Sequence, residues 1–248
     1  MNLEFNKKAG NNPLLAVQSL TKGAALVGHK KLRQYVLMPI LINLCLYSAM
    51  LYLGYQYVGV LIAQFIPDWL LWLDWLVYPL FFISFFVAGF FSFTLVANLI
   101  AAPFYGGLAA KTQHLLQDEQ GAVQEQAMLA VIGSEIKRMG YLISRAIPIV
   151  IISVIPGVNI IAPVLWGLFG AWGLSMEYFA YILENEGFLF AEQRQALKAV
   201  RIGALSFGGI VLFALMIPVL NIVIPPIAVI SAVIYRQKLA VKSIPSPK

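Results

Sequence analysis

Long runs of apolar residues without charge divide the chain, and segments with charged side chains separate them. The first two runs cover residues 35–67 and 75–110. A helix needs about 20 apolar residues to cross a bilayer, and both runs are longer. They predict two long transmembrane helices, over residues 35–66 and 75–110, each tilted or projecting beyond the bilayer.

Two later uncharged runs, residues 146–176 and 202–235, are each broken near the middle by a nine-residue stretch, and the two stretches share five residues. Ile155–Pro163 (IPGVNIIAP) returns 62 residues later as Ile217–Pro225 (IPVLNIVIP). Proline removes a backbone donor and clashes with the preceding turn, so neither run is expected to form one straight helix. The pattern predicts two helical hairpins, over residues 141–176 and 202–235. The predicted breaks are Pro156, Asn159, Pro218 and Asn221, with each asparagine capping the returning helix.

The arms of the predicted hairpins are too short to cross a bilayer. An arm from Val164 to Met176 has 13 residues and would reach about 20 Å, against a hydrocarbon core about 30 Å thick. We therefore expect re-entrant hairpins, which enter the membrane and turn back. Backbone at that depth is tolerated only when it is buried in protein or lines a watery cavity, which points to a pathway.

The remaining segments carry the charges and are expected in the cytoplasm. Residues 1–34 predict an amphipathic surface helix that begins near Pro13 and is capped by Asn11 or Asn12. Residues 111–145 predict cytoplasmic helices, and residues 236–248 a tail. The apolar side of the first helix is predicted to hold Leu14, Val17, Leu20, Ala24 and Val27.

Composition agrees with an all-α integral membrane protein. Hydrophobic residues make up 60% of the chain and charged residues 11%, and the mean hydropathy is +0.82, all outside the range of soluble proteins. The single cysteine, Cys45, and only two histidines give no basis for a disulfide or a metal site. A cleavable signal peptide is not expected, because the first 34 residues are polar and basic. No cofactor is predicted.

The basic residues predict the orientation. The loop 67–75 holds three tryptophans and no Lys or Arg, whereas residues 1–34 hold six basic side chains. By the positive-inside rule both termini are cytoplasmic. Re-entrant hairpins would keep all 17 basic residues on that side. If the two hairpins were instead full spans, residues 177–201 would lie outside. The tryptophans suit the membrane interface, and with no basic residue among them they do not suggest nucleic-acid binding.

No catalytic motif accompanies these features. The chain has no glycine-rich phosphate loop, no His-Glu-x-x-His and no paired cysteines. Ser153, His114 and Asp118 are too scattered to suggest a catalytic triad, and Glu135 is better explained as part of a solvated helix face. We therefore expect a protein that is not an enzyme, and transport that is passive or ion-coupled.

A group of basic residues lies just before the first predicted spanning helix. Lys30, Lys31 and Arg33 surround Leu32 there, and the first turn of a helix offers free amides and the positive end of its dipole. Cations beside a helix N-terminus make an anion site. The alternative is that these side chains only reach the lipid headgroups and set the topology.

The chain resembles the CysZ family of bacterial sulfate permeases over nearly its whole length. The residues that carry the resemblance are Arg33–Asn43 (RQYVLMPILIN), Ala97–Phe104 (ANLIAAPF), Ile155–Trp166 (IPGVNIIAPVLW), Ala171-Trp172, and Phe207-Gly208 leading to Ile217–Asn221. The resemblance implies two long spanning helices with two partly penetrating hairpins. It also implies a homo-oligomer of the bacterial inner membrane, without a cofactor, that imports sulfate for cysteine synthesis.

Sulfate is held in this family at a Gly-Leu-Arg motif, often followed by a second Arg. The matching residues here are Lys31, Leu32 and Arg33, with Gln34 in place of the second Arg, and Lys30 is a weaker candidate. The glycine of the motif is absent, but Lys31 adds a charge. Ala110 and Ala180 also replace acids that relatives often carry.

Further polar residues are candidates for the sulfate pathway. One set could steer the dianion or could instead pair with Glu135, Glu177 and Glu192: Arg138, Arg145, Arg194, Lys198 and Arg201. Asn98 could line the path or bond a neighbouring helix. The predicted partners are thus sulfate, membrane lipid and further copies of the chain. A membrane scaffold that transports nothing is the alternative function.

Overall fold

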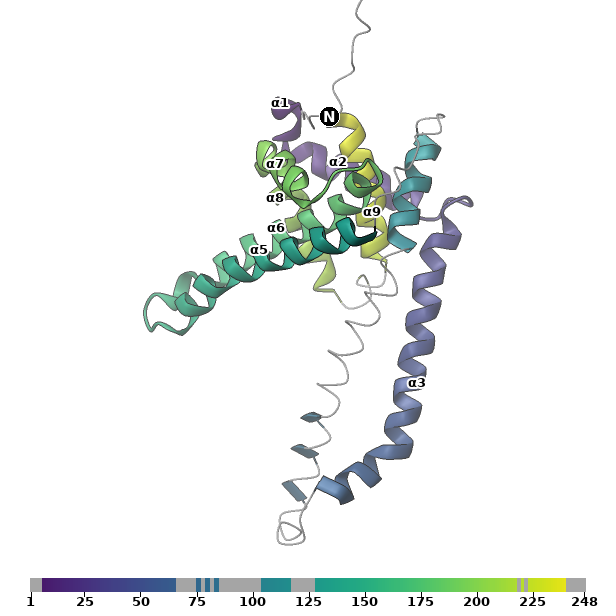
Figure 1. Ribbon diagram of the computed structural model, residues 1–248, viewed down its shortest axis with the longest axis vertical. Helices are drawn as coiled ribbons and strands as arrows, with labels where there is room; N and C mark the ends of the chain where they lie inside the picture. Colours follow the sequence, from purple (N-terminus) through teal and green to yellow (C-terminus); the bar gives the residue numbers. More distant parts are fainter. Residues whose placement is uncertain are drawn as a thin grey trace, which may run out of the picture. The chain divides into compact units, whose positions relative to one another are not determined.

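The computed structural model describes residues 6–65, 75–76, 79–80, 83–84, 104–116, 128–217, 220 and 223–239. The regular structure of these residues is helical, which confirms the predicted all-α class. The chain divides into two compact units, residues 1–33 with 105–248, and residues 34–104. Figure 1 labels the helices in chain order.

The N-terminal helix begins where its capping residues predict. After the short helix α1 (Lys7–Gly10), Asn12 accepts a hydrogen bond from the Leu14 amide at 2.9 Å and caps α2 (Pro13–Leu26), with proline in the first turn. Asn11 has a different role. Its side-chain oxygen accepts from the Ile202 amide at 3.0 Å and its nitrogen donates to the Ala199 carbonyl at 3.1 Å, so it caps a helix almost 200 residues away.

The buried face of α2 is made of small residues. Ala16, Ser19 and Gly23 are buried, and α2 packs on α9 (Ile224–Leu239) and α8 (Arg201–Leu215). Leu14 and Val17, on the predicted apolar side, remain exposed. The helix therefore has a packed face of small side chains and a separate apolar face that is free to contact a membrane surface.

The other unit contains α3 (Arg33–Phe65) from its second residue onward, a single helix of 33 residues that continues through Pro39. At about 1.5 Å per residue it reaches about 50 Å, longer than a hydrocarbon core. Leu44 and Val60 on it are exposed. The second predicted span falls mostly outside the described residues, which resume with a helix over residues 104–116.

The first hairpin is formed by α5 (Met128–Val154) and α6 (Ala162–Asn185), which pack together and meet at a tip over residues 155–161. Figure 1 shows the pair extending away from the other helices of its unit. Near the tip, the Trp166 indole donates to Ser153 Oγ at 3.1 Å. Ser153 thus joins the two arms, which is a structural role.

The tip turns at Pro156 and Gly157 and not at an asparagine cap. Pro156 lies two residues after Val154, the end of α5, and Gly157 has a φ of +83°, a conformation that favours glycine. The prediction that Asn159 caps α6 is wrong, because Asn159 begins a short 3₁₀ helix (η2, Asn159–Ile161) and no side chain caps α6. Pro163 has no amide hydrogen, so the first turn of α6 has one donor fewer to satisfy.

The returning arm is longer than its uncharged run. The helix α6 continues past Met176 to Asn185, 24 residues in all, or about 36 Å. The helix from Asn159 to Asn185 is long and apolar enough to cross a membrane, and α7 (Phe190–Ala199) with α8, bent by 102°, passes the same test only as a pair. The argument for re-entry from a 13-residue arm therefore does not hold for α6, which has 24 residues. Re-entry of the hairpin stays a prediction.

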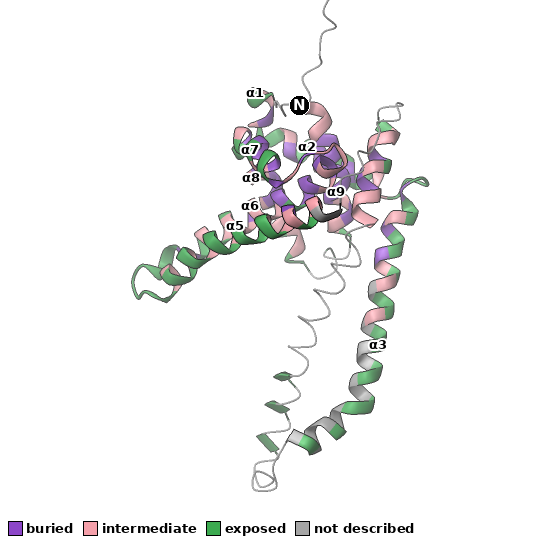
Figure 2. Cartoon of the chain, in the orientation of Figure 1, coloured by how far each residue is buried: buried purple, intermediate pink, exposed green. Residues whose placement is uncertain are grey.

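The second predicted hairpin corresponds to α8 and α9, and Pro218 and Asn221 lie outside the described residues. Both helices pack against α6 and form the core of this unit with it. Three rings fill the centre, Phe179, Phe207 and Tyr235, with centroids 5.2 to 6.1 Å apart and edge-to-face geometry. Figure 2 shows buried residues gathered in these helices and exposed residues along the first hairpin.

Candidate anion-binding sites

The turn before α3 is fixed by one histidine and one leucine. The carbonyl of His29 accepts from the Leu32 and Arg33 amides at 2.9 and 3.0 Å, and His29 Nδ1 accepts from the Lys31 amide at 3.3 Å. The Leu32 side chain is completely buried. The sequence around the turn therefore produces a fixed backbone that presents its polar side chains outward.

The three cations of this turn are exposed. Lys30, Lys31 and Arg33 all lie at the surface, and none forms an ion pair with the described residues. Because the amides of residues 31–33 already donate within the chain, an anion here would be bound by side chains and by amides beyond Arg33. Leu32 anchors the turn through its buried side chain, so its contribution to a site is positional.

A second group of cations surrounds a pocket at the base of the first hairpin. Arg145 of α5, Lys198 of α7 and Arg201 at the start of α8 line it together with Tyr141 and Trp172, and its volume is about 520 Å³. The sharp bend between α7 and α8, at the buried Val200, brings Lys198 and Arg201 to the same opening. The rest of the lining is apolar: Ile149, Leu165, Leu168, Phe169 and Leu205.

Aromatic rings hold two of the basic side chains in place. The guanidinium carbons of Arg145 and Arg194 lie 5.2 and 5.4 Å from the centre of the Tyr141 ring, and Arg194 also lies 5.9 Å from the Phe190 ring. These are cation–π distances. Because the ring neutralises little charge, both guanidinium groups keep their attraction for an anion.

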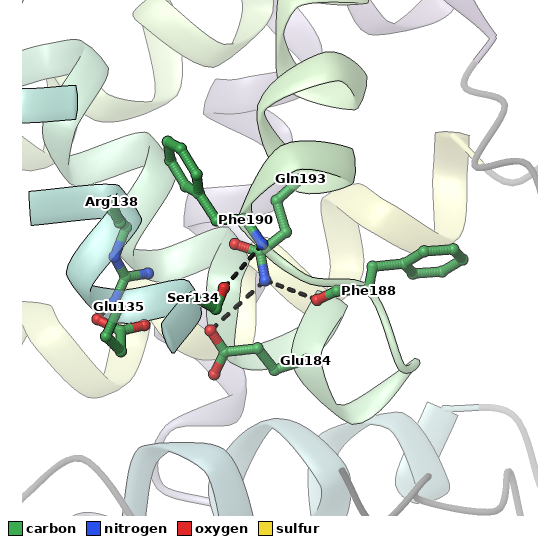
Figure 3. Close-up of polar contacts among 7 residues, drawn as sticks. All are labelled: Ser134, Glu135, Arg138, Glu184, Phe188, Phe190 and Gln193. Atoms are coloured by element: carbon green, nitrogen blue, oxygen red, sulfur yellow. Dashed lines mark hydrogen bonds and ion pairs between the residues drawn. The ribbon is translucent and has the colours of Figure 1, made fainter. Parts of the chain in front are cut away.

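Arg138 is in a different environment. It forms an ion pair with Glu135 one turn earlier on α5 (Figure 3). Beside this pair, Ser134 Oγ accepts from the Phe190 amide at 2.7 Å, and Gln193 Nε2 donates to the Phe188 carbonyl at 2.8 Å (Figure 3). This polar cluster joins α5 to α7, so the structure supports a structural role for Arg138.

The predicted pairing of basic residues with acids is thus confirmed for Arg138 alone. In the part of the chain that the structure describes, no ion pair involves Arg145, Arg194, Lys198 or Arg201. Glu192 caps α7 by accepting from the Leu189 amide at 3.0 Å. The four remaining basic side chains therefore lack the acidic partners that the sequence suggested.

The structure also shows polar groups that sequence reasoning missed. Glu186 pairs with Arg236 at 3.0 Å, joining the end of α6 to α9; burial raises the pKa of Glu186 above its usual value, and Arg236 opposes this. Lys22 and Lys238 line another pocket of about 400 Å³. Burial, and then the charge of Lys22, lower the pKa of Lys238. These two lysines are more than 200 positions apart in the chain, so no local sequence pattern predicts that they lie at the same pocket.

One predicted pathway residue cannot be placed, since Asn98 lies outside the described residues. The other candidates separate into two groups of cations and one paired arginine. In the turn at Lys30–Arg33 the exposed side chains are all basic, and Leu32 is buried. The pocket at the base of the first hairpin combines cations with a mostly apolar lining.

Comparison with known proteins gives a consistent result. The model of the family described as "Sulfate transporter CysZ/Etoposide-induced protein 2.4" matches residues 19–226. A protein of Pseudomonas fluorescens named "Sulfate transporter CysZ" is 39% identical over 228 residues, which cover 88% of this chain and 91% of the relative. Proteins of the same name from Pseudomonas syringae and Pectobacterium atrosepticum are 36% and 32% identical, over 90% and 85% of this chain and 91% and 80% of theirs.

Proposed function

Because this chain belongs to the sulfate transporter CysZ/Etoposide-induced protein 2.4 family, we propose that it is a sulfate permease of the bacterial inner membrane. Its role would be to import sulfate for cysteine synthesis. The observation that carries the proposal is the similarity to proteins named as sulfate transporters along nearly the full length of both chains.

The exposed apolar surface supports a membrane location. At the tip of the first hairpin Val154 is 75% and Ile160 80% exposed, and Val164 on the returning arm is 65% exposed. Side chains of this kind are favourable against lipid and costly against water. A hairpin with such a surface is expected to sit in the bilayer, whether it turns back inside or crosses.

Sulfate would bind at the turn before α3. Arg33 can offer two parallel donors to a tetrahedral oxyanion, and Lys30 and Lys31 add point charges. The fixed backbone and the absence of ion pairs to these cations in the described residues leave the three side chains ready for a dianion. Arg138 is not assigned to the pathway, because Glu135 already pairs with it.

Orientation and assembly are part of the same proposal. Both termini would lie in the cytoplasm, and several copies would form a homo-oligomer. In a Cys45→Ser background, cysteines at the exposed Lys8 and Gln195 should be labelled from the cytoplasmic side, and one at Asp74 from the opposite side. Labelling of Gln195→Cys from the periplasm would mean that the segment of the first hairpin crosses the membrane once, and would contradict this topology.

Flux through the purified protein is the direct test of transport. Liposomes containing the protein should accumulate labelled sulfate down its gradient without any nucleotide, and empty liposomes should not. A scaffold protein would give the flux of empty liposomes. The matched control is the Arg33→Ala variant, which should reconstitute equally well, because Arg33 is exposed, but should transport less at low sulfate.

A further inference from the structure

The pocket at the base of the first hairpin has a composition that sulfate alone does not explain. Three cations, Arg145, Lys198 and Arg201, contribute to its lining, and no carboxylate does. The exposed positions of all three and the absence of ion pairs to them in the described residues give it a net positive charge. The ligand is therefore expected to carry a negative charge.

Trp172 also lines this pocket. Its Nε1 is buried, and no group of the described residues accepts a hydrogen bond from it. A buried donor without a partner costs about 1 to 3 kcal/mol. Because this nitrogen is buried, a ligand oxygen could accept from it only if the Trp172 side chain turned toward the pocket.

Most of the lining, however, is apolar. Its apolar members are Ile149, Leu165, Leu168, Phe169 and Leu205. A free sulfate ion would leave these side chains in contact with water, whereas a hydrocarbon chain would cover them. The volume of about 520 Å³ is in the range of pockets for ligands larger than a small ion.

The position of the pocket on the hairpin suits a lipid. Arg145 is the last charged residue before the uncharged run of residues 146–176, and beyond it α5 exposes Ile147, Ile151 and Val154. Basic residues at the foot of an apolar segment mark the level of the headgroups. A lipid at this level would place its phosphate beside the cations and its chain along the hairpin.

We propose that this pocket binds an anionic phospholipid. The phosphate lies against Arg145, Lys198 and Arg201, and one acyl chain covers the apolar lining. The lipid would hold together the hairpin α5–α6 and the bend between α7 and α8, which provide the two sides of the pocket. This inference does not depend on sulfate transport, since the ligand and the residues differ from those of the Arg33 turn.

The test is binding of short-chain phosphatidylglycerol to the full-length protein in a nonionic detergent. The variant Lys198→Gln/Arg201→Gln removes two exposed cations, and each cation near a phosphate surface contributes about 1 kcal/mol, so affinity should fall about 30-fold. The control Lys7→Gln/Lys8→Gln removes the same charge from exposed positions on α1 and should bind like the wild type.

Several results would overturn the proposal. One is equal binding of phosphatidylcholine, which has no net charge. Another is an equal loss of affinity in the control variant. Displacement of the lipid by an equal concentration of sulfate would identify a free-anion site instead, and no saturable binding by the wild type would indicate that another protein surface, such as a second copy of the chain, covers the pocket.

Discussion

Sulfate binding is expected to weaken about 10- to 150-fold when Arg33 is replaced by Ala. The change removes a charge-assisted hydrogen bond of about 1.5 to 3 kcal/mol, and each 1.4 kcal/mol is a factor of ten in affinity. The effect should be on binding and not on folding, because Arg33 is exposed while the adjacent Leu32 is buried and anchors the turn. Equilibrium binding of labelled sulfate to the purified protein at fixed ionic strength measures it.

Two further variants make the result specific. Arg33→Lys should recover part of the affinity, since an ammonium keeps the charge but cannot reproduce the paired donors of guanidinium. Lys7→Ala, a similarly exposed cation on α1, should bind like the wild type. If Arg33→Ala and Lys7→Ala bind sulfate equally well, the basic turn is only a topology signal and sulfate is held elsewhere.

The parts of the fold that follow from local chemistry were predictable. Asn12 and Pro13 mark the start of α2 because a cap and a first-turn proline act within a few residues. Pro156 similarly marks the tip of the first hairpin. The cap assigned to Asn159 was wrong because Asn159 begins a 3₁₀ helix and α6 starts only at Ala162. The way in which the tip closes is not determined by the residue type at that position.

The sites were predictable only in part. The cations of the Arg33 turn are adjacent in sequence, so their cluster is visible there. The pocket of Arg145, Lys198 and Arg201 forms because the α7–α8 bend and the first hairpin come together, and residue types alone do not determine that contact. Likewise, the sequence offered Glu135, Glu177 and Glu192 as partners for five basic residues, but only Arg138 has its acid at helical spacing.

The helices α6 and α8 approach each other closely at Gly208, and a substitution there tests this packing. At Gly208 of α8, an added Cβ would overlap the carbonyl oxygen of Ala171 on α6 and crowd Ser175 Oγ, whose hydroxyl donates to the Ala204 carbonyl. The obstacle is backbone, which cannot rotate away. Small residues at such crossings let two helices approach closely, and here the approach carries the Phe179–Phe207 ring contact.

Gly208→Ala is therefore expected to destabilise the protein by about 1 to 3 kcal/mol, which corresponds to a fall of about 2 to 12 °C in melting temperature. Gly209→Ala is the matched control, because a Cβ there would meet its nearest neighbour, Ala171 Cβ, at an ordinary 3.9 Å. Since alanine favours a helix over glycine by up to about 1 kcal/mol, this control should be unchanged or more stable. Thermal unfolding of both variants in the same detergent measures the difference. Equal melting temperatures for the two would mean that α6 and α8 do not cross at Gly208 as closely as the structure shows.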